Sequence, residues 1–303
     1  MNLTALMPVR NEAWVLSYSA RVALRWVDNL VILLHACTDG SERIATDLAK
    51  EFWPRVTLLH VDGEKWDEMA HRQMMLVAAR DLKATHIAIV DADEVLTANL
   101  LDGGMREPTE GARGLPGFEG GFCSRTPQGS ILQLPGYNLR NGLNRYHSNG
   151  MWSNRWFSLS FADSPRLHWR SDSFHHREPF IAGSKELLRP YRPIRQGDGG
   201  IMHLWGANER RLRAKHRAYK ITEALRWPEK PRAEIETMYN WATSGSGPAD
   251  CPAVWTFDKV PDSWRYPDLE GYLDLDAVPW QEAWCDRMIA EHGRERFAGL
   301  SVC

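Results

Sequence analysis

Apolar and polar positions alternate between strand-like and helix-like patterns along the first 90 residues. Four short, mostly apolar runs have the length and continuity of strands that are covered on both faces: residues 3–9, 30–35, 56–61 and 86–90. Three segments between them place apolar side chains at helical spacing: residues 13–27, 41–52 and 66–82. Ser41 is a suitable N-cap for the second helix. This β-α-β-α-β-α-β order predicts an α/β fold, with a mostly parallel sheet flanked by helices.

The pattern becomes less regular after residue 93. Residues 103–150 are rich in Gly, Pro and Asn, which predicts hairpins and long loops. Residues 199–205 predict a short strand ending at a histidine, and residues 208–227 are the most helical segment of the second half. Residues 228–280 are rich in Pro and Trp, and we expect them to be irregular.

Three polar clusters follow the ends of predicted strands: Arg10-Asn11-Glu12, Thr38-Asp39-Gly40 and Asp91-Ala92-Asp93. In open α/β sheets, ligands bind beyond the carboxyl ends of the strands, so we expect these clusters to converge on one edge. Side chains at i and i+2 of an extended segment point the same way, which would aim Asp91 and Asp93 together and Glu94 away. Two such carboxylates suit a shared Mg²⁺ or Mn²⁺ ion that keeps open positions for substrate phosphates.

Bulk composition is that of an ordinary globular protein. The 303 residues are 43% hydrophobic and 25% charged, with a net charge of -2 and a pI of about 6.6. These values give no global signal for nucleic-acid or membrane binding. No apolar run reaches the roughly 18–20 residues of a transmembrane helix, and the first residues lack the features of a signal peptide. Five scattered cysteines without a C-x-x-C pair indicate reduced thiols, so we expect a cytoplasmic protein.

Four motifs in this order resemble those of family 2-type glycosyltransferases with the GT-A fold. They are Met7-Pro8-Val9-Arg10-Asn11-Glu12, Thr38-Asp39-Gly40-Ser41, Asp67 through Arg72, and Val90-Asp91-Ala92-Asp93-Glu94. The resemblance covers residues 1–100 well and extends more loosely to the His203 region. It implies a GT-A domain over residues 1–227, with a nucleotide-sugar-binding half at 1–100 and an acceptor half at 101–227. Residues 228–303 would form a C-terminal extension packed on that domain.

The resemblance also implies roles for individual residues. Pro8, Arg10 and Glu12 would border the nucleotide, and Asp39 would bind the base unless it is only a turn aspartate at the start of the next helix. Arg72 would lie near the diphosphate. Asp91 and Asp93 would flank the ribose and the metal, with Asp93 as the direct ligand. His203 would complete the metal shell or contact the diphosphate. The cofactors implied are Mn²⁺ or Mg²⁺ and a nucleoside-diphosphate sugar, with UDP as the carrier expected on family grounds.

The predicted helix after His203 is strongly basic. At about 100° per residue, one narrow stripe holds Arg210, Arg213, Arg217 and Lys220. Arg211 and Lys215 form a second basic edge. The stripe is either a solvated helix face or a patch for an anionic partner, such as the donor diphosphate, an anionic glycan or nucleic-acid phosphates. We include Lys215 among the expected donor contacts.

The acceptor side should be built by residues 151–180. An inverting transferase needs a carboxylate as general base for the acceptor hydroxyl, and the candidates are Asp172 and Glu178. A retaining enzyme needs no such base, so the stereochemistry stays open. The sequence therefore predicts a metal-dependent, hexosyltransferase-like glycosyltransferase that moves a sugar from a nucleotide-sugar to a hydroxyl of a glycan or related acceptor.

Three other functions remain open at this point. A phage-type glycosyltransferase acting on hydroxymethylated DNA bases would fit the basic stripe, although the near-neutral pI argues against DNA. A nucleotidyltransferase could use the same half-sheet and acidic triplet, but the Gly-rich phosphate loop typical of that class is missing. The chain could also be a catalytically silent nucleotide-binding module.

Overall fold

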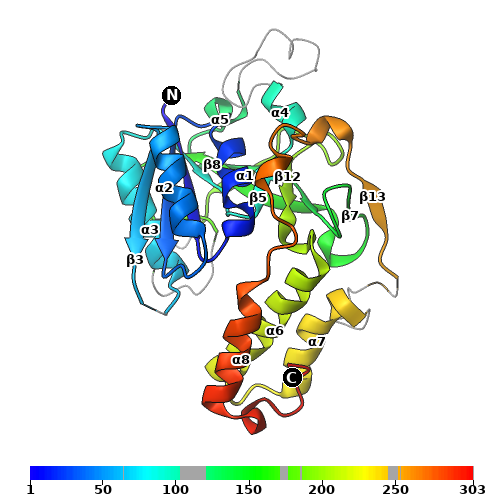
Figure 1. The fold of residues 1–303 in the computed structure, drawn as a ribbon. Coiled ribbons are helices and arrows are strands. Elements are labelled where there is room, and N and C mark those ends of the chain that lie inside the picture. The colour runs from blue at the N-terminus through cyan, green and yellow to red at the C-terminus, as the bar shows by residue number, and fades with distance from the viewer. Residues whose placement is uncertain are drawn as a thin grey trace. The chain divides into compact units, whose positions relative to one another are not determined.

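The fold is seen in a computed structural model, which describes residues 1–63, 65–102, 121–170, 177–184, 186–244, 252 and 254–302 (Figure 1). The first elements are β1 (Leu3–Val9), α1 (Ala13–Ala23), β2 (Asn29–His35), α2 (Ser41–Glu51), β3 (Val56–Val61), α3 (Glu68–Asp81), β4 (His86–Ile89), β5 (Glu94–Leu96) and α4 (Ala98–Asp102). The later elements are α5 (Phe122–Arg125), β6 (Ser130–Asn138), β7 (Arg145–His147), β8 (Arg155–Ala162), β9 (Leu167–His168), β10 (Phe180–Ile181), β11 (Arg189–Tyr191), β12 (Ile201–His203), α6 (Glu209–Arg226), α7 (Arg232–Ser244), β13 (Phe257–Lys259) and α8 (Trp280–His292).

The central sheet has the strand order β3-β2-β1-β4-β8-β6-β12-β5, with β11 beside β6. Strand β1 pairs in parallel with β2 and β4, and β2 pairs in parallel with β3. Strand β8 is antiparallel to both of its neighbours, β4 and β6. Parallel strands joined by crossover helices, followed by an antiparallel strand, confirm the predicted mostly parallel α/β sheet flanked by helices.

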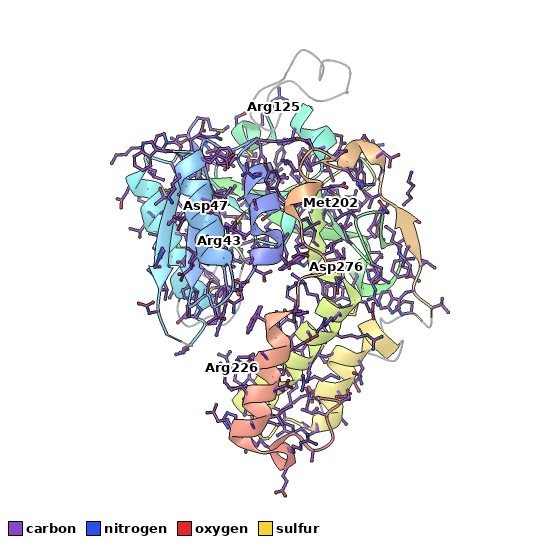
Figure 2. The ribbon with its side chains drawn as sticks, in the orientation of Figure 1. Arg43, Asp47, Arg125, Met202, Arg226 and Asp276 are labelled. Carbon is purple, nitrogen blue, oxygen red and sulfur yellow. The ribbon has the colours of Figure 1, made fainter. Side chains whose placement is uncertain are left out.

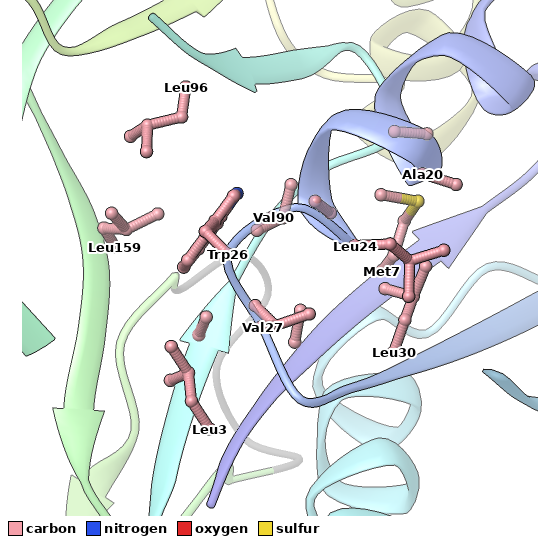
Figure 3. Close-up of a cluster of buried hydrophobic side chains, with 14 of the residues drawn as sticks. Leu3, Met7, Ala20, Leu24, Trp26, Val27, Leu30, Val90, Leu96 and Leu159 are labelled. Carbon is pink, nitrogen blue, oxygen red and sulfur yellow. The ribbon is translucent and has the colours of Figure 1, made fainter. Parts of the chain in front are cut away.

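Alternating side chains of β1 build a hydrophobic core on each face of the sheet. Leu3, Ala5 and Met7 point into the core that includes α1 and α2, whereas Leu6 points into the core on the α3 side. The first core also takes in Trp26, which lies among aliphatic side chains in the close-up of Figure 3. Burial on both faces explains why these strands read as continuous apolar runs.

Two local expectations were wrong. Ser41 is the first residue of α2 and Gly40 is the N-cap, because the Ser41 hydroxyl accepts a hydrogen bond from the Glu12 N–H at 2.9 Å instead. The segment expected to be irregular contains the 13-residue helix α7. This helix forms because Ile235 is completely buried in a core shared with α6 and α8, a tertiary contact that local composition does not reveal.

The chain divides into two compact units. Unit 1 comprises residues 1–136, 155–202 and 261–274, and unit 2 comprises residues 137–154, 203–260 and 275–303. These units differ from the division into residues 1–227 and 228–303 that was expected from the sequence. The expected division stays a prediction.

Figure 2 shows the side chains, including Arg43 and Asp47, which form an exposed ion pair one turn apart on α2. None of the helices in the described ranges is long and apolar enough to cross a membrane.

Candidate functional site

The loops after β1 and β2 are joined by side chains that bond the backbone. Asn11 has a left-handed backbone (φ 56°), and its buried Oδ1 accepts hydrogen bonds from the N–H groups of Thr38 at 2.6 Å and Asp39 at 3.2 Å. The Asp39 carboxylate accepts from Ala13 N–H at 3.0 Å and from Ser41 N–H at 2.9 Å. Asp39 thus has the contacts of a turn aspartate that fixes the starts of two helices, and its contact with a base stays a prediction.

The other residues expected to border the nucleotide lie at the same end of β1. Pro8 is buried in β1 and pairs with Leu33 of β2. Glu12 Oε2 accepts a hydrogen bond from the Trp14 indole at 2.5 Å. Arg10 is close enough to His35 for its charge to lower the pKa of that histidine, after the larger effect of burial.

An aromatic cluster that we did not expect lies beside Arg10. The rings of His35, Trp66 and His71 contact one another with centroid separations between 4.7 and 5.2 Å. Burial, together with the smaller effect of the neighbouring His35, lowers the pKa of His71 to about 4. Both histidines are therefore neutral near pH 7. The signal in the sequence was His35 itself, a polar residue that ends an otherwise apolar strand.

Arg72 lies on α3 with only 2% of its side chain exposed. Its Nε donates to Glu68 Oε1 at 2.9 Å, and its Nη2 donates to Asp91 Oδ1 at 3.1 Å. Within the part of the chain that the structure describes, the buried Nη1 has no hydrogen-bond acceptor. A buried guanidinium with one such donor is suited to an anionic ligand, because a phosphate oxygen would satisfy it.

Asp91 lies between two arginines. Its Oδ1 faces Arg72, and its Oδ2 accepts a hydrogen bond from Arg177 Nη1 at 3.0 Å. Burial raises the pKa of Asp91, but the charges of Arg72 and Arg177 outweigh burial and hold that pKa below the usual range for an aspartate. Asp91 is therefore ionised at neutral pH. We did not predict Arg177, although it belongs to the dense polar sequence His175-His176-Arg177-Glu178.

The acidic triplet forms a turn instead of the extended segment that we expected. Glu94 N–H donates to the Asp91 carbonyl at 3.0 Å, and Asp91 N–H donates to Glu94 Oε2 at 3.2 Å. The expectation that Glu94 points away from Asp91 was therefore wrong, since Arg177 bonds both carboxylates. Asp93 lies within this turn and is 7% exposed.

Of the two candidate bases, only Glu178 lies within the described residues; Asp172 is outside them. Glu178 Oε1 accepts hydrogen bonds from the Ser158 hydroxyl and, at 3.3 Å, from Gln133 Nε2. Both donors belong to the antiparallel strands β8 and β6 of unit 1. Glu178 is thus held on the sheet by neutral donors, and its role as a base stays a prediction.

His203 belongs to unit 2, where its Nδ1 lies 3.0 Å from Asn138 Oδ1. That oxygen also accepts from the Trp205 indole at 2.9 Å, while Asn138 Nδ2 donates to the Trp152 carbonyl at 2.9 Å. These bonds fix the amide orientation, so a neutral His203 carries its proton on Nδ1 and its lone pair on Nε2. This tautomer leaves Nε2 able to bind a metal ion while Nδ1–H is held by a hydrogen bond, and the ligand role of His203 stays a prediction.

The basic stripe of α6 pairs with acidic side chains inside unit 2. Its ion pairs are Arg210–Glu282 at 2.7 Å, Arg213–Glu209 at 3.1 Å, Arg217–Asp286 at 2.7 Å and Lys220–Glu236 at 2.9 Å. Three of these four partners lie on α7 or α8, so the charges of the stripe are compensated within unit 2. Arg210 and Arg213 keep 57% and 61% of their side chains exposed, as expected of a solvated helix face. A compensated stripe gives no argument for DNA. Lys215 is half-buried on α6, and its role as a donor contact stays a prediction.

The residues at the triplet fit a metal ion only in part. In the stretches that the structure describes, no three His, Cys, Asp or Glu side chains gather closely enough to hold an ion together. Asp91 fits a direct ligand poorly, because both of its oxygens face guanidinium groups. The role of Asp93 as a direct ligand stays a prediction; Mg²⁺ is commonly held by one or two carboxylates together with substrate phosphates and water.

Comparison with known proteins gives similarity to solved structures alone. No protein-family model and no curated protein matches the chain. It is similar to glucosyl-3-phosphoglycerate synthase from Mycobacterium tuberculosis in complex with Mn²⁺, UDP and phosphoglyceric acid, at 16% identity over 31% of this chain and 33% of that one, with a TM-score of 0.24.

Two further solved structures are matched over a larger share of their own length. S. aureus TarS 1-349 matches at 10% identity over 80% of this chain and 73% of that one, with a TM-score of 0.39. A 4-diphosphocytidyl-2C-methyl-D-erythritol synthase matches at 18% identity over 53% and 74%, with a TM-score of 0.29. This chain spans about a third of the length of the first matched structures.

Proposed function

We propose that this chain is a glycosyltransferase that moves a sugar from a nucleoside-diphosphate sugar, with UDP as the preferred carrier, to a hydroxyl group of a glycan or related acceptor. The nucleotide would lie at the carboxyl ends of β1, β2 and β4, bordered by Pro8, Arg10, Glu12 and Asp39. This edge of a mostly parallel sheet is where α/β proteins bind ligands.

The observation that carries the proposal is the buried Arg72 beside Asp91. A guanidinium that is 2% exposed, and whose Nη1 has no acceptor among the described residues, is costly unless a ligand completes it. The departing diphosphate of a nucleotide-sugar supplies the oxygen atoms and the negative charge that this donor needs. Asp91, kept ionised by its two arginines, would accept hydrogen bonds from the ribose hydroxyls.

A divalent cation would be held by Asp93, with phosphate oxygens and water as its remaining ligands. When bound, it would neutralise negative charge on the diphosphate. Glu178 would be the general base in an inverting reaction, where a carboxylate takes the proton of the acceptor hydroxyl. Its hydrogen bonds with Ser158 and Gln133 would fix the carboxylate for that task.

Replacing Asp93 with Asn should lower Mn²⁺-dependent release of UDP from a UDP-sugar by about 100-fold, because the cation loses its carboxylate ligand. The measurement is UDP release from UDP-glucose and related donors, with and without Mn²⁺. Asp163→Asn is the matched control, since Asp163 is also a largely buried carboxylate of unit 1, paired with Arg80 at 2.8 Å. A folded Asp93→Asn protein with wild-type activity would count against the proposal.

The product that the protein releases separates the competing functions. Release of UDP supports a glycosyltransferase, whereas release of pyrophosphate from a nucleoside triphosphate would indicate a nucleotidyltransferase. Binding of UDP without any turnover across a panel of acceptors would indicate a nucleotide-binding module. Transfer to hydroxymethylated DNA, with an affinity that falls steeply with salt, would restore the DNA alternative.

A further inference from the structure

The guanidinium group of Arg177 is hydrogen-bonded through all three of its nitrogen atoms. Its Nη1 donates to Asp91 Oδ2 at 3.0 Å and to Glu94 Oε1 at 2.8 Å. Its Nη2 donates to Glu94 Oε2 at 2.6 Å and to the Ile89 carbonyl at 3.1 Å, and its Nε donates to the Ser158 carbonyl at 2.8 Å. A guanidinium has five N–H groups, so these bonds use the complete set.

These bonds connect parts of unit 1 that are distant in sequence. The Ile89 carbonyl ends β4, Asp91 and Glu94 belong to the turn that follows it, and Ser158 lies in β8. The pairing with Glu94 is a two-pronged guanidinium–carboxylate contact, which restricts orientation as well as distance. A lysine could supply the charge of Arg177 but not this geometry.

The residue that follows Arg177 is the candidate base. Glu178 accepts a hydrogen bond from the Ser158 hydroxyl, while the carbonyl of the same serine accepts from Arg177. The consecutive side chains of Arg177 and Glu178 are therefore both hydrogen-bonded to Ser158 of β8. Arg177 also bonds the acidic turn, and Glu178 also bonds Gln133 of β6. A shift of Asp91 would be transmitted to Glu178 through the Asp91–Arg177 hydrogen bond and the peptide unit that joins Arg177 to Glu178.

We propose that Arg177 is a positioning residue, which fixes the Asp91 carboxylate in its turn and holds Glu178 at a set place relative to it. This role rests on the proposed function, because it gives the two carboxylates their tasks on the donor and acceptor sides. Arg177 acts through Asp91, Glu94 and Ser158. Its loss should loosen the acidic turn first and weaken donor binding as a consequence.

The first test needs no ligand. Hydrogen exchange of the backbone amides of Asp91 and Glu94 is measured in the wild type, in Arg177→Gln and in Arg80→Gln. Arg80 is the matched control, because it also bonds a carboxylate with two nitrogens, at 2.8 and 2.9 Å, and donates to backbone carbonyls of unit 1. We expect faster exchange at the acidic turn in Arg177→Gln and no change there in Arg80→Gln.

The second test measures the affinity for UDP with Mn²⁺ by calorimetry. Arg177→Gln should bind about tenfold more weakly than the wild type, Arg177→Lys should lie between them, and Arg80→Gln should bind as the wild type does. In a double-mutant cycle, Arg177→Gln should add little to the effect of Asp91→Asn, because both changes break the same contact.

The outcomes separate this inference from the proposed function. Unchanged exchange at Asp91 and Glu94 in a folded Arg177→Gln protein would overturn the inference, as would multiplicative effects in the cycle. Arg177→Lys provides the same exchange test if the Gln variant does not fold. A wild-type protein that binds no UDP would instead count against the proposed function, while the exchange result would still decide whether Arg177 fixes the turn.

Discussion

Arg72→Met should lower the free energy of unfolding by about 3–5 kcal/mol, because it removes one partner from a buried ion network. The Arg72 side chain is 2% exposed, and Glu68, which bonds it at 2.8 Å, is 11% exposed. Methionine fills a similar volume but donates no hydrogen bond, so Glu68 would lose the hydrogen bonds and the charge of Arg72 in a largely dry place. Asp91 would keep one arginine, since Arg177 still bonds its other oxygen.

The measurement is chemical denaturation of the wild type and of two variants. Arg43→Met is the matched control, because Arg43 also forms an i,i+4 ion pair on a helix, at 3.5 Å from Asp47, but its side chain is 76% exposed. An exposed pair of this kind contributes about 0.3–0.5 kcal/mol. Equal, small losses in both variants would show that the Arg72 network contributes nothing beyond a surface pair.

The sequence predicted the first half of unit 1 well, and the physical reason is local. Strands covered on both faces must be apolar throughout, so β1, β2 and β4 stand out from the polar helix faces between them. The carboxyl ends of parallel strands share an edge, which predicted that the clusters around Asn11, Asp39 and Asp91 lie close together. The hydrogen bonds from the N–H groups of Thr38 and Asp39 to Asn11 join the first two of these clusters.

The contacts that the sequence did not reveal come from residues far apart in the chain. Arg177 bonds Asp91 and Glu94 across more than 80 positions, and no local pattern distinguishes such an arginine from a solvated one. The turn at the acidic triplet also escaped prediction, because the i, i+2 rule holds only for extended backbone. The acidic partners of the basic α6 stripe escaped prediction for the same reason: they lie on α7 and α8, follow the stripe in sequence and meet it only on folding.

Gly200→Ala should cost about 3–5 kcal/mol of unfolding free energy, because its environment has no room for a methyl group. A Cβ at Gly200 would lie 2.0 Å from the carbonyl oxygen of Pro135 and 2.8 Å from its carbonyl carbon. Both are backbone atoms of β6, so relief would require one strand of the sheet to move. Gly200 also has φ +156°, a conformation that other residues rarely adopt.

Gly200 cannot shift alone, because Thr97 forms hydrogen bonds with both its N–H group and its carbonyl group. The Gly200 N–H donates to Thr97 Oγ1 at 2.9 Å, and the Gly200 carbonyl accepts from Thr97 N–H at 2.8 Å. Gly197→Ala is the matched control: Gly197 has φ +98° but nothing within 4 Å of its Cβ position, so backbone strain alone should cost about 1–2 kcal/mol. Denaturation of the two variants should therefore separate steric exclusion from strain. Equal losses of unfolding free energy in the two variants would mean that the β6 backbone moves at Pro135 to accept the methyl group. The close approach of Gly200 to Pro135 would then not stabilise this part of the sheet.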